Sequence, residues 1–173
     1  MSELELIHYD AGFTYDPTRV YTPEDRHGCG KPVGLWVSVK GDDDWWWWCH
    51  DRAGDDDEPF EAESFAHAYR VHLAPGHNVL HIQSGQELEE FHTAYAAPTE
   101  FEDHMAEHFG HFGEEFLRLR WPIDWAKVAL DCQGLIIAPY QWNHRLSMMW
   151  YYGWDCSSGC IWDLSAIKSV EEI

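Results

Sequence analysis

Residues 31–38 have the sequence KPVGLWVS. They overlap the apolar run Val33–Val39, which predicts a strand. Upstream, Leu4–Tyr9 has the apolar alternation of a short strand. The segment Asp10–Lys31 between them is rich in Pro, Gly, Asp and Thr, and is therefore expected to form a long loop. We expect the two strands to be neighbours in one sheet.

Four later segments also have the composition of strands: Ala68–Leu73, Asn78–Ile82, Gly134–Ala138 and Cys160–Trp162. The Pro75-Gly76 turn between the first two predicts a hairpin. Cys160–Trp162 is the last strand that the pattern indicates, and a turn is expected at Asp163–Ile167.

Helices are predicted at three places. Ser84 and Glu87 have capping-box spacing, ahead of a helix with Leu88, Phe91 and Tyr95 on one face. Residues 101–119 have a helical apolar pattern, and Asp124–Ala129 predicts a short helix. For Trp45–Cys49 the sequence leaves a helix and an aromatic wall as alternatives.

The length of the chain indicates one domain, residues 1–173. Hydrophobic residues make up 45% of it, which is enough apolar surface for a packed core. No apolar run approaches the roughly 18 residues of a membrane span, and the N-terminus lacks a secretion signal. A soluble cytoplasmic protein whose five cysteines are reduced is therefore expected.

The chain is strongly acidic, with a formal net charge of −20. Such a charge repels phosphate backbones and argues against direct nucleic-acid binding. It leaves mimicry of DNA toward a basic partner as an alternative to a purely solubilising role. Two acidic runs, Asp42–Asp44 and Asp55–Glu58, are predicted to be solvated loops.

Tryptophan is abundant, with 11 residues, four of them consecutive at Trp45–Trp48. Neither a strand nor a helix can turn four consecutive side chains toward one core. Some of these rings are therefore expected to line a cleft or an interface, where aromatic walls suit planar ligands. A partly exposed core cluster or an oligomer contact is the alternative.

None of the common catalytic and metal-binding motifs predicts a site in this sequence. His104, His108 and His111 have helical i, i+4, i+7 spacing, but a solvated helix face is preferred and no metal site is predicted. Cys156 and Cys160 lack a second cysteine pair for structural zinc. The sequence has no nucleophile elbow, phosphate-binding loop or dinucleotide fingerprint.

Several segments, taken in order, resemble the ADP-ribosyltransferase superfamily. They are LIHY (6–9), KPVGLWVS (31–38), YRVHLAPGHNVLHI (69–82), LDCQGLII running into GLIIAPY (130–140) and SGCIWDLSAI (158–167). The resemblance is to compact phage and bacterial members, including anti-CRISPR transferases. It implies an α+β fold with a central split, antiparallel or mixed β-sheet and flanking helices.

The resemblance also implies roles for particular residues. In the superfamily a His or Arg on the first strand contacts the nicotinamide ribose, and a Ser, Thr or Tyr on the second lies beside nicotinamide. His8 and Ser38 match these positions, with Trp36 near the stacking position. The predicted NAD contacts are His8, Tyr9, Gly34, Trp36, Ser38 and Trp162.

The chain departs from the family at the catalytic acid. Where the family has a glutamate, about five residues before Asp163, this chain has Ser158, which offers a hydrogen bond but no stabilising charge. Asp155 or Asp163 is the predicted substitute. His8, Ser38, Asp155 and Ser158 are thus the predicted catalytic residues.

The resemblance implies a protein of phage or bacterial origin that acts in the cytoplasm. NAD would be its substrate, and ADP-ribose would be transferred to a macromolecular target, expected to be a host protein. A non-catalytic acidic inhibitor of host defence on the same fold is the alternative. A third hypothesis is a sugar- or nucleotide-binding module that uses the tryptophan wall.

Overall fold

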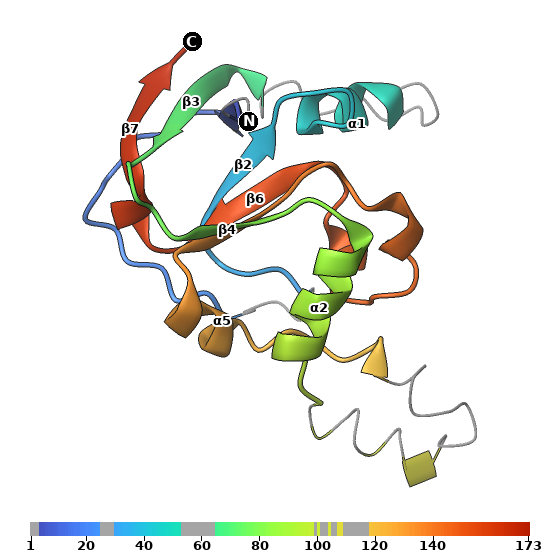
Figure 1. Ribbon diagram of the computed structural model, residues 1–173. Coiled ribbons are helices and arrows are strands. Elements are labelled where there is room, and N and C mark those ends of the chain that lie inside the picture. The colour runs from blue at the N-terminus through green and yellow to red at the C-terminus, as the bar shows by residue number, and fades with distance from the viewer. Residues whose placement is uncertain are drawn as a thin grey trace.

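The computed structural model describes residues 4–24, 30–52, 65–98, 100, 104, 107–108 and 118–173. These residues form a single-sheet α+β fold with a seven-stranded mixed sheet (Figure 1), which confirms the coarse prediction of the fold class. The strands are β1 (Leu6–Asp10), β2 (Leu35–Val39), β3 (His67–Leu73), β4 (Val79–Ile82), β5 (Gly134–Ile137), β6 (Ser158–Ile161) and β7 (Ile167–Glu172).

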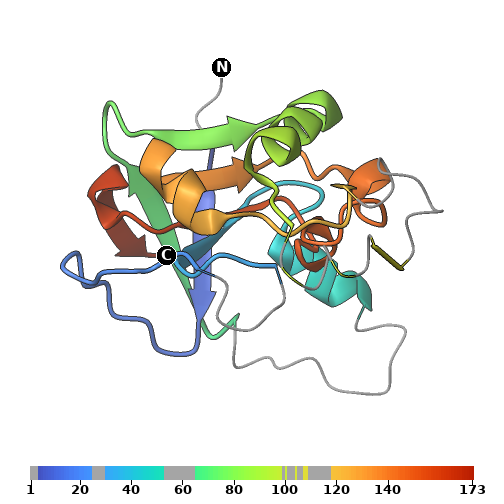
Figure 2. The same cartoon turned by 90° about the horizontal axis from the view of Figure 1, so that it is seen from below.

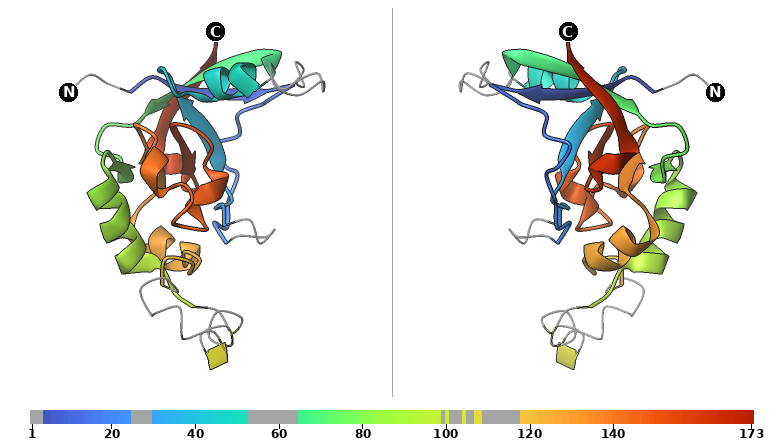
Figure 3. Two further views of the ribbon diagram at one scale, coloured as in Figure 1. Left: turned by 90° about the vertical axis from the view of Figure 1, so that its right-hand side faces the viewer. Right: turned by 90° about the vertical axis from the view of Figure 1, so that its left-hand side faces the viewer.

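The strand order is β4-β5-β6-β2-β1-β3-β7, and only the β4–β5 pair is parallel among the described strands. The sheet is curled rather than flat (Figures 1 and 3). The first two predicted strands, β1 and β2, are direct neighbours, with Leu6 opposite Val39 and Ile7 opposite Ser38. The β2 strand therefore lies between β1 and β6.

Two predictions about the sheet were wrong. β3 and β4 do not form a hairpin, because β3 pairs with β1 and β7 while β4 pairs with β5 at the other edge. The strand β6 is not the last, since β7 follows it and pairs with β3. β7 is mostly exposed and polar, so it lacks the apolar alternation that marks a strand in sequence.

Among the described residues, the helices with defined bounds are α1 (Trp45–Arg52), α2 (Gly85–Tyr95) and α5 (Trp125–Asp131). Short 3₁₀ turns occur at η3 (Trp142–His144), η4 (Tyr151–Gly153) and η5 (Leu164–Ala166). Seen from below, α5 lies in front of the strands while α1 lies to one side (Figure 2). The predicted helix at residues 101–119 lies largely outside the described residues.

Helices α2 and α5 begin where the sequence predicts. The Ser84 hydroxyl accepts a hydrogen bond from the Glu87 backbone N–H at 3.2 Å, and Leu88 and Phe91 are buried as the periodicity indicates. Asp124 accepts from the Lys127 N–H at 3.0 Å in the same way. Both predicted helix starts are therefore confirmed.

The tryptophan run adopts the helical alternative and forms α1. The prediction of a fully solvated acidic loop before it was wrong, because Asp44 is buried. Its Oδ1 accepts from the Trp47 N–H at 2.7 Å and its Oδ2 from the Gly41 N–H at 3.3 Å, so the carboxylate holds the start of α1. Residues 55–58 lie outside the described part of the chain.

Hydrophobic cores form on both faces of the sheet. One core packs α2 and α5 against β5 and β6, and it is rich in aromatic rings, including Trp125, Trp150 and Trp154. The other contains aliphatic side chains of β1, β2 and β3 together with the β6–β7 connection. Alternating residues of β2 and β6 thus divide between an aromatic and an aliphatic side.

A buried histidine joins the aromatic core to the chain near residue 118. His92 on α2 accepts a hydrogen bond at Nδ1 from the Trp150 indole N–H at 3.0 Å, and its Nε2 donates to the Arg118 carbonyl at 2.8 Å. The ring needs one protonated and one free nitrogen for this arrangement, so it is neutral. Burial lowers the pKa of His92, although its bond to Arg118 opposes the shift.

We expect folding stability to fall as the pH drops below about 6.5, the ordinary histidine pKa of the unfolded chain. Above that pH the ring is neutral in both states, whereas below it the unfolded chain binds the proton first. His92→Gln keeps a donor and an acceptor but does not titrate, so its stability should depend less on pH. Urea unfolding at pH 7.5, 6.0 and 5.0 measures this, with exposed His50→Gln as the control. Equal pH slopes for wild type and His92→Gln would contradict the expectation.

Two further observations concern the lengths of the helices and the state of the cysteines. Among the described residues, none of the helices is long and apolar enough to cross a membrane. The four described cysteines, Cys49, Cys132, Cys156 and Cys160, are free and buried.

Candidate functional site

A pocket of about 200 Å³ opens where β1, β2 and the start of β6 lie side by side. Six of the residues predicted from sequence line it: His8, Tyr9, Trp36, Ser38, Asp155 and Ser158. They come from positions as far apart as residues 8 and 158, so the strand order of the sheet brings them together. Ser38 lies opposite Ile7 on one side and opposite Ser158 on the other, which places it at the centre of the group.

His8 is fixed by the neighbouring strand. Its Nδ1 lies 2.7 Å from the Trp36 carbonyl oxygen, which can only accept, so Nδ1 carries the proton and Nε2 keeps a lone pair. Burial lowers the pKa of His8, although the Trp36 bond and the nearby Asp10 oppose the shift. The ring is therefore neutral at pH 7 and offers Nε2 as a hydrogen-bond acceptor.

An aromatic wall closes one side of the pocket. The Trp36 and Trp154 rings meet edge to face with centroids 4.8 Å apart. The Lys31 ammonium lies 5.2 Å from the centre of the Trp36 ring, within the range of a cation–π contact. The Trp154 indole nitrogen is buried and has no hydrogen-bond partner among the described residues.

The two serines differ in what they can offer a ligand. The Ser38 oxygen accepts from the Trp45 N–H at 2.8 Å, and this bond leaves its own O–H available to donate. The Ser158 hydroxyl donates to the Cys156 carbonyl at 3.0 Å, so its proton is already used within the chain. Ser38 is therefore the better placed hydroxyl donor.

Asp155 is the only carboxylate among the described residues that line the pocket. One of its oxygens accepts from the Arg145 guanidinium at 2.9 Å, and both side chains are largely buried. Arg145 in turn lies over the rings of Trp48 and Tyr152, at 4.6 and 5.2 Å from their centroids. The negative charge at the pocket is thus held in place but partly neutralised.

Gly34 and Trp162, the other two predicted NAD contacts, lie outside the pocket lining. A Cβ at Gly34 would lie 2.6 Å from the Cys160 sulfur, so the glycine lets β2 approach β6 closely. Trp162 is buried in the aromatic core, where its indole N–H donates to the Cys132 carbonyl at 2.8 Å. Gly34 thus allows close strand packing, and the Trp162 side chain packs in the core. Asp163, the other predicted substitute for the acid, also lies outside the lining and caps η5.

Sequence reasoning missed six lining residues: Ile7, Lys31, Val37, Trp45, Trp154 and Cys156. Lys31 is the first residue of the segment KPVGLWVS (31–38), which also contains Trp36. This closeness in sequence could have identified Lys31 as a lining residue. Trp154 and Cys156 carry no local signal, because their place depends on the turns that precede β6. Burial raises the pKa of Cys156 to about 12 and that of Cys160 well above its ordinary value, which argues against either thiol as a nucleophile.

A larger hollow of about 960 Å³ lies on the other face of the sheet. Val39 and Ser157 line it, whereas their neighbours Ser38 and Ser158 line the small pocket, as expected from the alternation of strand side chains. Its cations are already paired: Arg70 lies 3.0 Å from Glu5, which also lies 3.5 Å from Lys40. The smaller pocket is therefore the better candidate site, because its Lys31 has no carboxylate partner among the residues that the structure describes.

No known protein family, curated protein or solved structure matched this chain in the three comparisons. The candidate site therefore rests on its geometry and on the residues that line it.

Proposed function

We propose that the protein binds NAD with its nicotinamide ring in the pocket beside Trp36, and transfers ADP-ribose to a macromolecular target. The observation that carries this proposal is the pocket lined by Ser38, Asp155 and the Trp36 and Trp154 rings, with His8 also in its lining. His8 and Ser38 lie on β1 and β2, the strands to which the family resemblance assigns the ribose and nicotinamide contacts. Asp155 lies just before β6, near the position where the family has its catalytic glutamate.

The size of the pocket supports a ring rather than a whole dinucleotide. A cavity of about 150 Å³ is known to hold benzene, so about 200 Å³ suits one six-membered ring with a small substituent. Trp36 and Trp154 supply aromatic surface for that ring. The Ser38 O–H is a donor that a carboxamide oxygen would satisfy.

The remaining parts of NAD would extend out of the pocket. Lys31 is the only Lys or Arg among the described lining residues, and we assign it to the diphosphate. The free Nε2 of His8 would accept a hydrogen bond from a ribose hydroxyl. Local positive charge matters here, because the net charge of −20 otherwise repels an anionic ligand.

Transfer requires breaking the bond between nicotinamide and ribose C1′, which leaves positive charge on the ribose while an acceptor nucleophile attacks. Asp155 is the group that would stabilise this charge. Its pairing with Arg145 weakens that effect, and we therefore expect slow turnover. The same pairing favours a second candidate function, NAD-dependent binding of a partner without transfer.

Titration of the purified protein with NAD, followed by tryptophan fluorescence and calorimetry, tests the binding. His8→Ala is expected to weaken NAD binding about tenfold, which corresponds to the loss of one hydrogen bond of about 1.4 kcal/mol. His50→Ala, an exposed histidine outside the pocket, should bind NAD like the wild type.

Nicotinamide release, measured by chromatography with and without lysate, separates the two candidate functions. Release would support transfer, whereas NAD binding without release would support the binding-only function. If wild type binds no NAD at millimolar concentration, or if His8→Ala and His50→Ala bind it equally, the proposal is wrong.

A further inference from the structure

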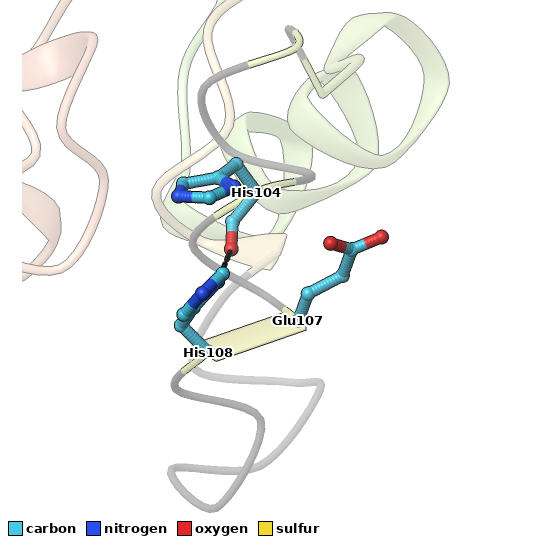
Figure 4. A group of neighbouring side chains, drawn as sticks. All are labelled: His104, Glu107 and His108. Carbon is cyan, nitrogen blue, oxygen red and sulfur yellow. Dashed lines mark hydrogen bonds between the residues drawn. The ribbon is translucent and has the colours of Figure 1, made fainter.

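We propose that His104, Glu107 and His108 form a binding site for a late first-row divalent metal ion, with Zn²⁺ as the ion that best fits these ligands. The three side chains are exposed, and each offers one ligand atom within 4.8 Å of the other two (Figure 4). The site shares no residue with the pocket beside Trp36 and is independent of the function proposed for it.

The spacing of the three residues places them on one face of a helix. All three have α-helical backbone, and positions i, i+3 and i+4 are neighbours on a helical surface. Two imidazoles and one carboxylate form a ligand set found in zinc sites that keep a fourth position for water. The sequence HMAEH (104–108) supplies this set within little more than one turn.

The tautomer of His108 is suited to binding a metal. Its Nδ1 lies 3.0 Å from the His104 carbonyl oxygen, which can only accept, so Nδ1 is protonated (Figure 4). The lone pair then remains on Nε2. Donation of the other ring N–H to a backbone carbonyl is the arrangement that metal-binding histidines commonly show.

Little movement is needed to close the site around an ion. The His104 and His108 rings are already adjacent, with centroids 4.2 Å apart. Zinc ligands lie about 2.0–2.2 Å from the metal, so atoms up to 4.8 Å apart must draw together slightly. Exposed side chains can do so through rotation about their χ torsions.

The ligand chemistry selects the class of ion. Imidazole nitrogen favours Zn²⁺, Cu²⁺ and Ni²⁺, whereas Mg²⁺ and Ca²⁺ prefer six or more oxygen ligands. The described chain also has His–Glu pairs between β3 and β7, His67 with Glu172 and His72 with Glu171. Each offers one imidazole, and Glu171 is shared with Arg70, so we expect these pairs to bind metal more weakly.

The experiment uses the full chain after dialysis against EDTA. Calorimetric titration with Zn²⁺ at pH 7.5 measures affinity and stoichiometry, and electron paramagnetic resonance with Cu²⁺ counts the bound nitrogens. We expect the tightest site to show two imidazole nitrogens and to disappear in His104→Ala/His108→Ala. The matched double variant His67→Ala/His72→Ala should keep it.

Two outcomes would overturn the proposal: absence of Zn²⁺ binding by the wild type, or equal tight binding by wild type and His104→Ala/His108→Ala. Glu107→Gln tests the third ligand and should weaken Zn²⁺ binding by about tenfold or more, in the range seen when metal-site partners are removed. Unchanged affinity in Glu107→Gln would overturn the three-ligand assignment. Circular dichroism of each variant establishes that it is folded.

Discussion

Asp155→Asn is expected to lower the rate of nicotinamide release about 100- to 1000-fold, the loss typical when one electrostatic stabiliser of a transition state is removed. Asp155 is the one carboxylate among the described lining residues, and asparagine keeps its shape while removing its charge. NAD binding should change much less, because positive charge on the ribose develops only as the bond to nicotinamide breaks. Release rate and NAD affinity measured on the same preparation check both parts.

Asp42→Asn is the matched control, since Asp42 is exposed and lies outside the pocket lining. Asp155→Asn also leaves Arg145 without its carboxylate, so its thermal unfolding has to be measured beside the kinetics. If folded Asp155→Asn releases nicotinamide at the wild-type rate, Asp155 does not stabilise the transition state. A folded variant with a proportional loss of NAD affinity would instead assign the residue to binding.

Gly34→Val is expected to destabilise the fold by about 3 kcal/mol, at the upper end of the usual cost of overpacking. A Cβ at this position would lie 2.6 Å from the Cys160 sulfur and 2.7 Å from the Ile161 carbonyl oxygen. The second contact is with the backbone of β6, so relief requires the two strands to separate. A melting temperature about 6–12 °C lower is expected for a chain of this size.

Gly12→Val controls for the loss of a glycine, because no atom lies within 4 Å of the position where its Cβ would be. Its stability should stay within about 0.5 kcal/mol of the wild type. Gly34 lies outside the pocket lining, so the folded fraction of Gly34→Val should still bind NAD. Wild-type stability combined with lost NAD binding would instead assign Gly34 to the ligand.

Local signals in the sequence predicted most element types. Apolar alternation located β1 and β3, apolar runs located β2 and β5, and the capping box of Ser84 and Glu87 located the start of α2. These signals work because side-chain periodicity and backbone capping depend on residues within one or two turns. The candidate residues His8 and Ser38 came from the family resemblance, and the sheet places them around one pocket.

Some features left no local trace. Asp44 lies in an acidic run, and the sequence therefore predicts that it is exposed to solvent. In the fold its carboxylate instead caps α1. The β7 strand pairs along β3 with few buried residues, so burial left no pattern in its sequence. Trp162 and Trp36 look alike in sequence, yet one is buried in the core and the other lines the pocket.

The sequence by itself determined most of the segments that form strands and helices, with β7 as the exception, because those preferences are set largely by neighbouring residues. It also determined the strong negative charge and the supply of aromatic rings. Only the tertiary structure decided that β4 pairs with β5 rather than β3, and that Arg145 neutralises Asp155 beside the pocket. The first contact joins segments that are distant in the chain, and the second is set by irregular turns. In neither case does side-chain spacing in the sequence indicate which groups will meet.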